Sequence, residues 1–200
     1  MLCEAPFRCE HNLTFTFKIN LQGKHVLELG SGAGLSGFVA ANYASKVVLT
    51  DGNEIVMRLL HKNCAFVKKT APSCCPVSAA RLYWGDKDAV DKLVEEHGVP
   101  DILCGADIIM WPNFALTLCE TLSFFFAHKP DMEAYVSYVL RATSTTRLLY
   151  ECAEKCGLTV EVIEPDVFLP PEDWQPKGLT LVETKYIMKI GRKRLAPQDA

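Results

Sequence analysis

The sequence lacks any apolar run long enough to cross a membrane. The most apolar stretch, residues 122–127, falls far short of the roughly 20 residues that a spanning helix needs. The chain also lacks an excess of basic residues, since its formal net charge is −3. No basic start followed by a long apolar run marks the N-terminus as a leader. We therefore expect neither a membrane nor a nucleic-acid partner.

Cysteine is plentiful, but it forms no recognisable pattern. There are nine cysteines, an odd count, and no two have the CxxC spacing of a redox or zinc motif. Cys152 and Cys156 lie one helical turn apart, but no histidine or acid completes a zinc set. The five histidines are scattered and form no catalytic group with serine or cysteine. We expect buried thiols and no metal. We also expect a reducing compartment, namely the cytoplasm, with the nucleus as an additional location.

Length and composition indicate one globular domain with a real core. The chain has 200 residues, of which 49% are hydrophobic and 22% charged. We expect a single domain over 1–200, with a short N-terminal extension at 1–22, a core at 23–190 and a polar tail at 191–200. We also expect a monomer.

Short apolar segments alternate with amphipathic ones along most of the chain. After a half-buried strand at 13–19, strands are predicted at 26–29, 46–50, 77–83, 101–107, 133–140, 158–163 and within 179–190. Helices are predicted between them at 34–43, 54–69, 89–96, 114–127 and 143–156. A proline-rich loop at 164–177 joins the last two strands, which are therefore expected to be antiparallel. The predicted fold is α/β, a doubly wound, Rossmann-like seven-stranded sheet with an antiparallel last strand.

The stretch at 26–37 is the most informative, because a strand runs through glycines into a helix. Gly32, Gly34 and Gly37 satisfy GxGxxG, which would suit a dinucleotide. Glu28 stands just before the glycines and disfavours a pyrophosphate, because it adds like charge where phosphates would lie. A cationic ligand without phosphate, such as S-adenosylmethionine, fits better. Asp51 closes the next strand and could accept both ribose hydroxyls of either ligand.

Residues 27–37, Leu-Glu-Leu-Gly-Ser-Gly-Ala-Gly-Leu-Ser-Gly, resemble motif I of the seven-β-strand S-adenosylmethionine-dependent methyltransferases. More narrowly, the chain resembles methyltransferase family 16, which includes the lysine methyltransferases of calmodulin, valosin-containing protein and elongation factors. The supporting segments are 49–53, 83–86, 106–109 and 185–190; Trp-Gly at 84–85 and Ala-Asp-Ile-Ile at 106–109, in register, are what point to family 16. The resemblance covers roughly residues 24–190.

The resemblance implies that S-adenosylmethionine is the cofactor. In the family the segment after the third strand lines the adenine pocket, so Trp84 would form an aromatic wall beside a backbone donor or carboxylate from 85–86. The cofactor-binding residues expected here are Glu28, Gly30, Ser31, Gly32, Gly34, Leu35, Asp51, Gly52, Asn53, Trp84, Gly85 and Ala106.

The resemblance also implies a site for the methyl acceptor at the end of the fourth strand. The family has an acid there, followed by a tyrosine; this chain has Asp107, then Met110 and Trp111. Asp107 would accept a hydrogen bond from the target amine and orient its lone pair. Trp111 would line the lysine channel through cation–π contact. Positioning and desolvation would provide much of the catalysis, and water could take the proton.

The predicted function is methyl transfer from S-adenosylmethionine to a lysine of a protein substrate. One alternative is another acceptor, namely a protein arginine or histidine, a small molecule or RNA. A second is a binding or scaffold protein that keeps the fold without turnover. Met110 supports it, as does the missing Gly-x-x-x-Trp segment that family members carry before motif I; Phe7, Phe15 and Phe17 are the aromatics there. A third, a nucleotide-dependent oxidoreductase, is disfavoured by Glu28 and the antiparallel last strand.

Overall fold

The computed structural model describes residues 19–140, 142–163 and 185–193. Several sequence predictions fall outside these ranges and stay predictions: the strand at 13–19 except for its last residue, the proline-rich loop at 164–177, and most of the tail at 191–200. The three N-terminal phenylalanines also lie outside them.

Seven strands and five helices make up the described chain, and each predicted core element is present. The strands are β1 (His25–Leu29), β2 (Lys46–Asp51), β3 (Val77–Arg81), β4 (Ile102–Ala106), β5 (Glu133–Val139), β6 (Leu158–Ile163) and β7 (Lys185–Arg192). The helices are α2 (Leu35–Ala40), α3 (Glu54–Thr70), α4 (Lys87–His97), α5 (Phe114–His128) and α6 (Thr143–Lys155).

Several predicted ends differ from the structure by one to three residues, and two of them have clear local reasons. β3 ends at Arg81 rather than residue 83, although the Leu82 N–H still donates to the Asp51 carbonyl (3.1 Å). This strand lies at the sheet edge, where its last residues turn toward the end of β2. α2 ends at Ala40 rather than residue 43, because the chain tightens there: the Tyr43 N–H donates to the Ala40 carbonyl (3.0 Å), three residues back.

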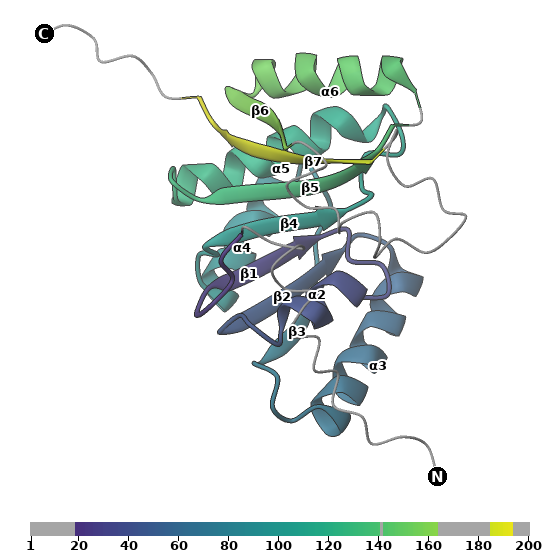
Figure 1. The fold of residues 1–200 in the computed structure, drawn as a ribbon, viewed down its shortest axis with the longest axis vertical. Coiled ribbons are helices and arrows are strands. Elements are labelled where there is room, and N and C mark those ends of the chain that lie inside the picture. The colour runs from purple at the N-terminus through teal and green to yellow at the C-terminus, as the bar shows by residue number, and fades with distance from the viewer. Residues whose placement is uncertain (1–18, 141, 164–184, 194–200) are drawn as a thin grey trace, which may run out of the picture.

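The seven strands form one sheet in the order β3-β2-β1-β4-β5-β7-β6 (Figure 1). β1 pairs in parallel with both β2 and β4, whereas β7 pairs antiparallel with β5 and β6. The predicted doubly wound sheet with an antiparallel last strand is confirmed. The chain runs outward from β1 to β3 and then returns to β4 on the other side of β1. The carboxyl ends of β1 and β4 therefore flank the crevice where such sheets bind ligands.

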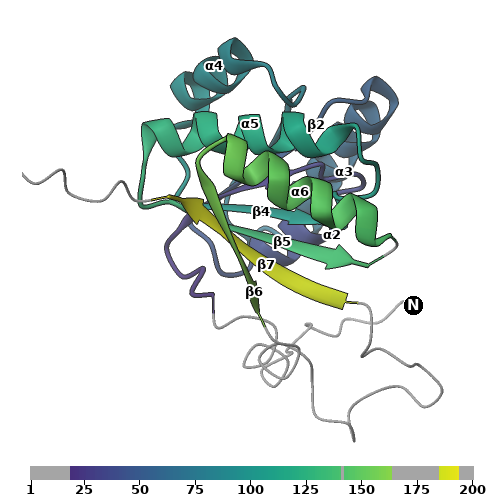
Figure 2. The ribbon, with the colours of Figure 1, turned by 90° about the horizontal axis from the view of Figure 1, so that it is seen from above.

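Helices cover both faces of the sheet. α4, α5 and α6 lie together on one face, as Figure 2 shows, and α2 and α3 pack on the other. α5 is apolar on nearly every side because it lies between the sheet and α6; Leu118, Leu122, Phe125 and Phe126 are fully buried. Within the described ranges no helix, α5 included, has the length and apolar character needed to span a bilayer.

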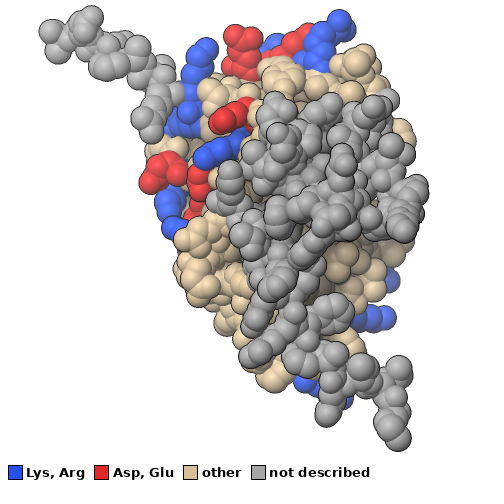
Figure 3. All heavy atoms as spheres, in the orientation of Figure 1, with Lys and Arg blue, Asp and Glu red and all other residues tan. Residues whose placement is uncertain are grey.

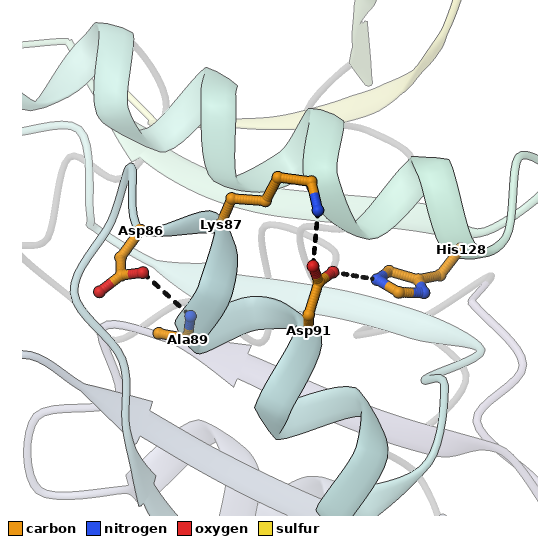
Figure 4. Close-up of polar contacts among 5 residues, drawn as sticks. All are labelled: Asp86, Lys87, Ala89, Asp91 and His128. Carbon is orange, nitrogen blue, oxygen red and sulfur yellow. Dashed lines mark hydrogen bonds and ion pairs between the residues drawn. The ribbon is translucent and has the colours of Figure 1, made fainter.

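Side chains just before α3 and α4 determine where these helices begin. The Asn53 Oδ1 atom accepts hydrogen bonds from the N–H groups of Ile55 (2.9 Å) and Val56 (3.2 Å). The Asp86 Oδ1 atom accepts from the Ala89 N–H (2.9 Å), as Figure 4 shows. The chain segments that follow β2 and β3, at the carboxyl edge of the sheet, are thereby held in place.

α4 is also tied to the far end of α5 by side chains. Figure 4 shows Asp91 between Lys87, whose Nζ lies 2.5 Å from one carboxylate oxygen, and His128, whose Nε2 lies 2.8 Å from the other. The hydrogen bond from Lys87, and then that from His128, lowers the pKa of Asp91. All three groups are at the surface, so this contact orients the helices more than it stabilises them.

Candidate functional site

A loop of alternating glycines, residues 30–34, connects β1 to α2 and is here called the glycine loop. Gly30 has φ 63° and Gly32 has φ 54°, in the left-handed region that favours glycine. A Cβ on Gly30 would lie 2.8 Å from Ile108 Cγ2 and 3.3 Å from Trp84 Cζ2, whereas one on Gly32 would meet nothing within 4 Å. The loop is thus closely packed at Gly30 and open at Gly32, where a ligand could lie against the backbone.

Ser31 fixes the glycine loop to β2. Its N–H donates to the Thr50 carbonyl (2.8 Å), and its hydroxyl accepts from the Thr50 N–H (3.0 Å) and donates to the Glu28 carbonyl (3.2 Å). The side chain is buried. Its hydroxyl therefore serves the loop itself, so any contribution of Ser31 to ligand binding comes through the backbone.

Asp51 links the end of β2 to the glycine loop. One carboxylate oxygen accepts from the Gly32 N–H (3.2 Å) and the other from the Asn53 N–H (2.8 Å). Each carboxylate oxygen has two lone pairs, so each retains one for a further donor. This arrangement suits a ligand with two adjacent hydroxyls, such as a ribose.

Glu28 lies beneath the glycine loop rather than beside its open side. Its side chain is 1% exposed, and Oε2 accepts a hydrogen bond from the Gly37 N–H (3.2 Å) in the first turn of α2. Burial raises the pKa of Glu28 to about 7, while hydrogen bonds from Ser31, Ser36 and the Gly37 N–H act in the opposite direction. The carboxyl thus supplies the N-terminal cap that α2 otherwise lacks, since Gly34 has no side chain.

Trp84 brings the segment after β3 to the glycine loop. Its indole packs against Gly30 and stands edge-on to Phe114, with ring centroids 6.0 Å apart at 90°. The other polar groups of this segment are engaged elsewhere. The Gly85 N–H donates to Thr121 Oγ1 (2.8 Å), and the Asp86 carboxylate caps α4. The Gly85 N–H is thus engaged with α5, and of the two kinds of group expected to contact an adenine, the Asp86 carboxylate keeps lone pairs beyond the one that caps α4.

Side chains that were not predicted as site residues also help form this edge. Tyr83 is 55% exposed and its ring adjoins Gly52, where a Cβ would lie 3.1 Å from Tyr83 Cδ1. The Arg81 guanidinium lies 5.8 Å from the centre of the same ring. Ile108 closes the other side of Gly30. Only the position of Tyr83 beside Trp84 could have indicated its role from sequence.

Asp107 follows β4 in an unusual backbone conformation. Its φ is 56°, the one positive value at a non-glycine position in the part of the chain that the structure describes. Its N–H donates to the Ser137 carbonyl at the neighbouring strand β5 (2.9 Å). Asn113, not Asp107, occupies the N-cap position of α5, so Asp107 does not serve as a simple helix cap. Such strained residues are frequent at functional sites.

The segment between Asp107 and α5 presents apolar side chains to solvent. Ile108 and Ile109 are buried, whereas Met110 is 47% and Trp111 59% exposed. Nearby, a cavity of about 220 Å³ opens on the α2 side of the sheet, with Ala106 among the residues that line it. Of the other residues predicted to bind the cofactor, Leu35 is exposed at the start of α2, and Gly34 packs against Leu49 and Leu60.

The described residues contain no group of three or more histidine, cysteine or acidic side chains that could hold a metal ion. The seven cysteines in the described ranges are free thiols. Burial raises the pKa of the Cys119 thiol to about 12, so this thiol is unreactive at neutral pH.

The chain matches one family model, described as lysine methyltransferase, over residues 8–154. It is 28% identical to the mouse histone-arginine methyltransferase METTL23 over 68% of this chain and 53% of that protein. It is 33% identical to the zebrafish (Danio rerio) protein N-lysine methyltransferase METTL21A over 69% of this chain and 60% of that protein. The chain thus spans about half the length of the curated relatives it matches.

Solved structures share the fold. A TehB-like SAM-dependent methyltransferase from Corynebacterium glutamicum superposes with a TM-score of 0.56 at 15% identity, covering 86% of this chain and 82% of that one. At this identity the likeness concerns the fold alone.

Proposed function

The chain belongs to the lysine methyltransferase family, and from that membership we propose that it transfers a methyl group from S-adenosylmethionine to a lysine side chain of another protein. One observation carries the proposal. The glycine loop, Asp51 and Asp107 meet at the carboxyl ends of β1, β2 and β4, at the point where the strand order reverses.

The residues at this edge fit S-adenosylmethionine. Gly32 leaves open space over the backbone, and Asp51 retains an acceptor on each oxygen for the two ribose hydroxyls. Trp84 offers an aromatic surface for the adenine. When bound, the cofactor supplies a methyl group that its sulfonium already makes electrophilic. Glu28, beneath the loop, would favour a cationic ligand through its negative charge.

Asp107 is our choice for the residue that orients the acceptor. Its backbone is fixed by the left-handed φ and by the hydrogen bond to Ser137, so its position is well determined. Its carboxylate would accept a hydrogen bond from the lysine nitrogen and direct the lone pair toward the methyl group. Trp111 would pack along the lysine side chain and keep water away. Since water can accept the released proton, no dedicated base is required.

A protein arginine is the second candidate acceptor, favoured by the similarity to the mouse histone-arginine methyltransferase. A carboxylate such as that of Asp107 can pair with a guanidinium through two parallel hydrogen bonds. The resemblance leads one to expect a tyrosine at Met110, and this departure from the family pattern keeps arginine as an alternative acceptor.

We further propose that the protein acts as a monomer in the cytoplasm, or in the nucleus as well. The free thiols of the described cysteines support a reducing compartment. The net charge of −3 argues for a protein substrate over RNA.

Two measurements test the proposed function. Calorimetry should show binding of S-adenosylhomocysteine but not of NAD; binding of neither would favour the scaffold alternative. The protein is incubated with cell lysate and tritiated S-adenosylmethionine, and the substrate that becomes labelled only when the protein is added is hydrolysed. This hydrolysis should release methyl-lysine. Methylarginine as the product would instead establish the second candidate.

The role of Asp107 needs a variant that keeps its backbone conformation. Asp107→Asn is suitable, because asparagine tolerates positive φ and has the same shape. Methyl transfer should be lost while S-adenosylhomocysteine binding is retained. Asp131→Asn, at an exposed acid before β5, is the matched control and should retain activity. Full activity in Asp107→Asn would show that this carboxylate does not orient the acceptor.

A further inference from the structure

One row of α3 presents large apolar side chains to solvent. Ile55 is 75%, Leu59 47% and Phe66 65% exposed. With Lys62 and Lys69, also exposed, they follow one another at spacings of four, three, four and three residues. This is the spacing at which successive side chains line one side of a helix that packs against another helix. We call these five residues the α3 seam.

The α3 seam is not the side of α3 that holds the helix on the sheet. Met57 and Leu60 do that, and both are buried in the core with α2 and β2. The seam therefore adds nothing to the core, and its three apolar side chains face solvent. Apolar side chains gathered in this way on a protein surface mark interaction sites more often than isolated ones do.

The charge on α3 is mainly basic. Arg58, Lys62, Lys68 and Lys69 are exposed on α3, and the helix has a single acid, Glu54, which is paired with Arg58 (2.7 Å). In Figure 3 the basic side chains at the lower right, where α3 runs in Figure 1, have no acidic side chain among them in that view. A partner for this surface should therefore be acidic.

From this geometry we infer that the α3 seam is a docking site for an acidic amphipathic helix of another protein. Ile55, Leu59 and Phe66 span about 16 Å along the axis, at a rise of about 1.5 Å per residue, and would receive the apolar side chains of the partner. Lys62 and Lys69 would cover the contact with their stems and pair their ammonium groups with partner carboxylates.

The same charges disfavour a second copy of this chain on the seam. A two-fold contact would place the seam lysines of one copy among the basic side chains of the other, which is repulsive. The inference does not depend on the proposed methyl transfer. The seam does lie near the site, because Asn63 on the same helix donates to the Ala33 carbonyl in the glycine loop (2.9 Å).

The test uses the full chain and a fluorescein-labelled synthetic helix of about three heptads, with leucine at the a and d positions and glutamate at the flanking positions. Fluorescence anisotropy should show binding in the micromolar range. Leu59→Ser combined with Phe66→Ser should weaken it by at least about tenfold, as expected for loss of central apolar anchors. Val99→Ser, at an exposed apolar side chain in the loop after α4, should leave it unchanged.

A charge exchange makes the test specific. Lys62→Glu with Lys69→Glu should abolish binding of the glutamate peptide and gain binding of the same peptide with lysine in place of glutamate. Because all four substituted side chains are exposed, the variants should fold, and thermal unfolding checks this. Absence of peptide binding, or binding that these substitutions leave unchanged, would overturn the inference. So would Phe66-dependent retention on anionic vesicles, or Phe66-dependent dimerisation in sedimentation.

Discussion

Replacing Glu28 with glutamine should stabilise the protein at high pH and leave its stability nearly unchanged at low pH. The carboxyl is 1% exposed, and burial raises its pKa from 4.5 to about 7. Between these values the folded protein holds a proton that the unfolded chain releases, so the free energy of unfolding falls as pH rises. Above pH 7 the loss is complete, at about 3 kcal/mol. Glutamine stays neutral and can still accept the Gly37 N–H.

Urea unfolding of the two proteins at about pH 5 and about pH 8 measures this difference. With a slope of about 2 kcal/mol per molar urea, Glu28→Gln should raise the midpoint by about 1.5 M at the higher pH and by much less at the lower one. Glu161→Gln, at an exposed carboxyl on β6, is the control and should shift neither midpoint appreciably.

The opposite result would refute the burial argument. If Glu28→Gln is less stable than the parent protein at about pH 8, the ionised carboxylate is stabilised where it lies. Ligand binding gives a second readout. S-adenosylhomocysteine retains the ammonium group of the cofactor, so loss of the negative charge should weaken its binding at the same pH. Stability and affinity should thus change in opposite directions.

Three further predictions concern the loop, the sheet and the core. Gly30→Ala should lower both the melting temperature and S-adenosylhomocysteine affinity, because its Cβ would clash with Ile108. Gly32→Ala has open space around its Cβ and carries only the strain of the positive φ, so it should lower the melting temperature by less; a loss as large as that of Gly30→Ala would contradict this packing. Glu133→Gln should cost less than about 1 kcal/mol near neutral pH. The hydrogen bond from Lys189 lowers the pKa of Glu133, so this contribution is present above the unfolded pKa and disappears as pH falls; urea unfolding that shows the same cost in acid would exclude the pair as its source. Phe125→Ala should cost about 3–5 kcal/mol in urea unfolding, since the ring is fully buried, and a cost under about 1 kcal/mol would mean that the core closes around it.

The order of elements could be predicted from sequence because each has a strong local pattern. Alternating apolar segments specify the parallel strands, and the missing helix between the last two strands predicts their antiparallel pairing, which the sheet confirms. Asp51 and the glycine loop were also accessible, because a strand end followed by glycines places these groups at one edge of the sheet.

What the sequence could not provide is which partner each polar group takes. Glu28 was expected to bind the cofactor, and the structure adds that its carboxyl lies beneath the glycine loop, where it caps α2. Gly85 was expected among the cofactor-binding residues, and its N–H donates to Thr121, a residue on α5. Tyr83 and Ile108 reach the site only because strands distant in sequence are neighbours in the sheet. These pairings depend on tertiary packing, which spacing along the chain does not encode.

The place of β7 in the sheet has a consequence for how the chain is made. β7 comes last of the seven strands along the sequence, yet it lies between β5 and β6 and is their shared partner. During synthesis, β5 can pair only with β4, and β6 has no partner, until residues beyond 185 leave the ribosome. At about 5–20 residues per second, that leaves one edge of β5 and both edges of β6 unpaired for seconds. A nascent chain stalled before β7 would therefore offer these edges to other chains, which makes aggregation a hazard of this interval.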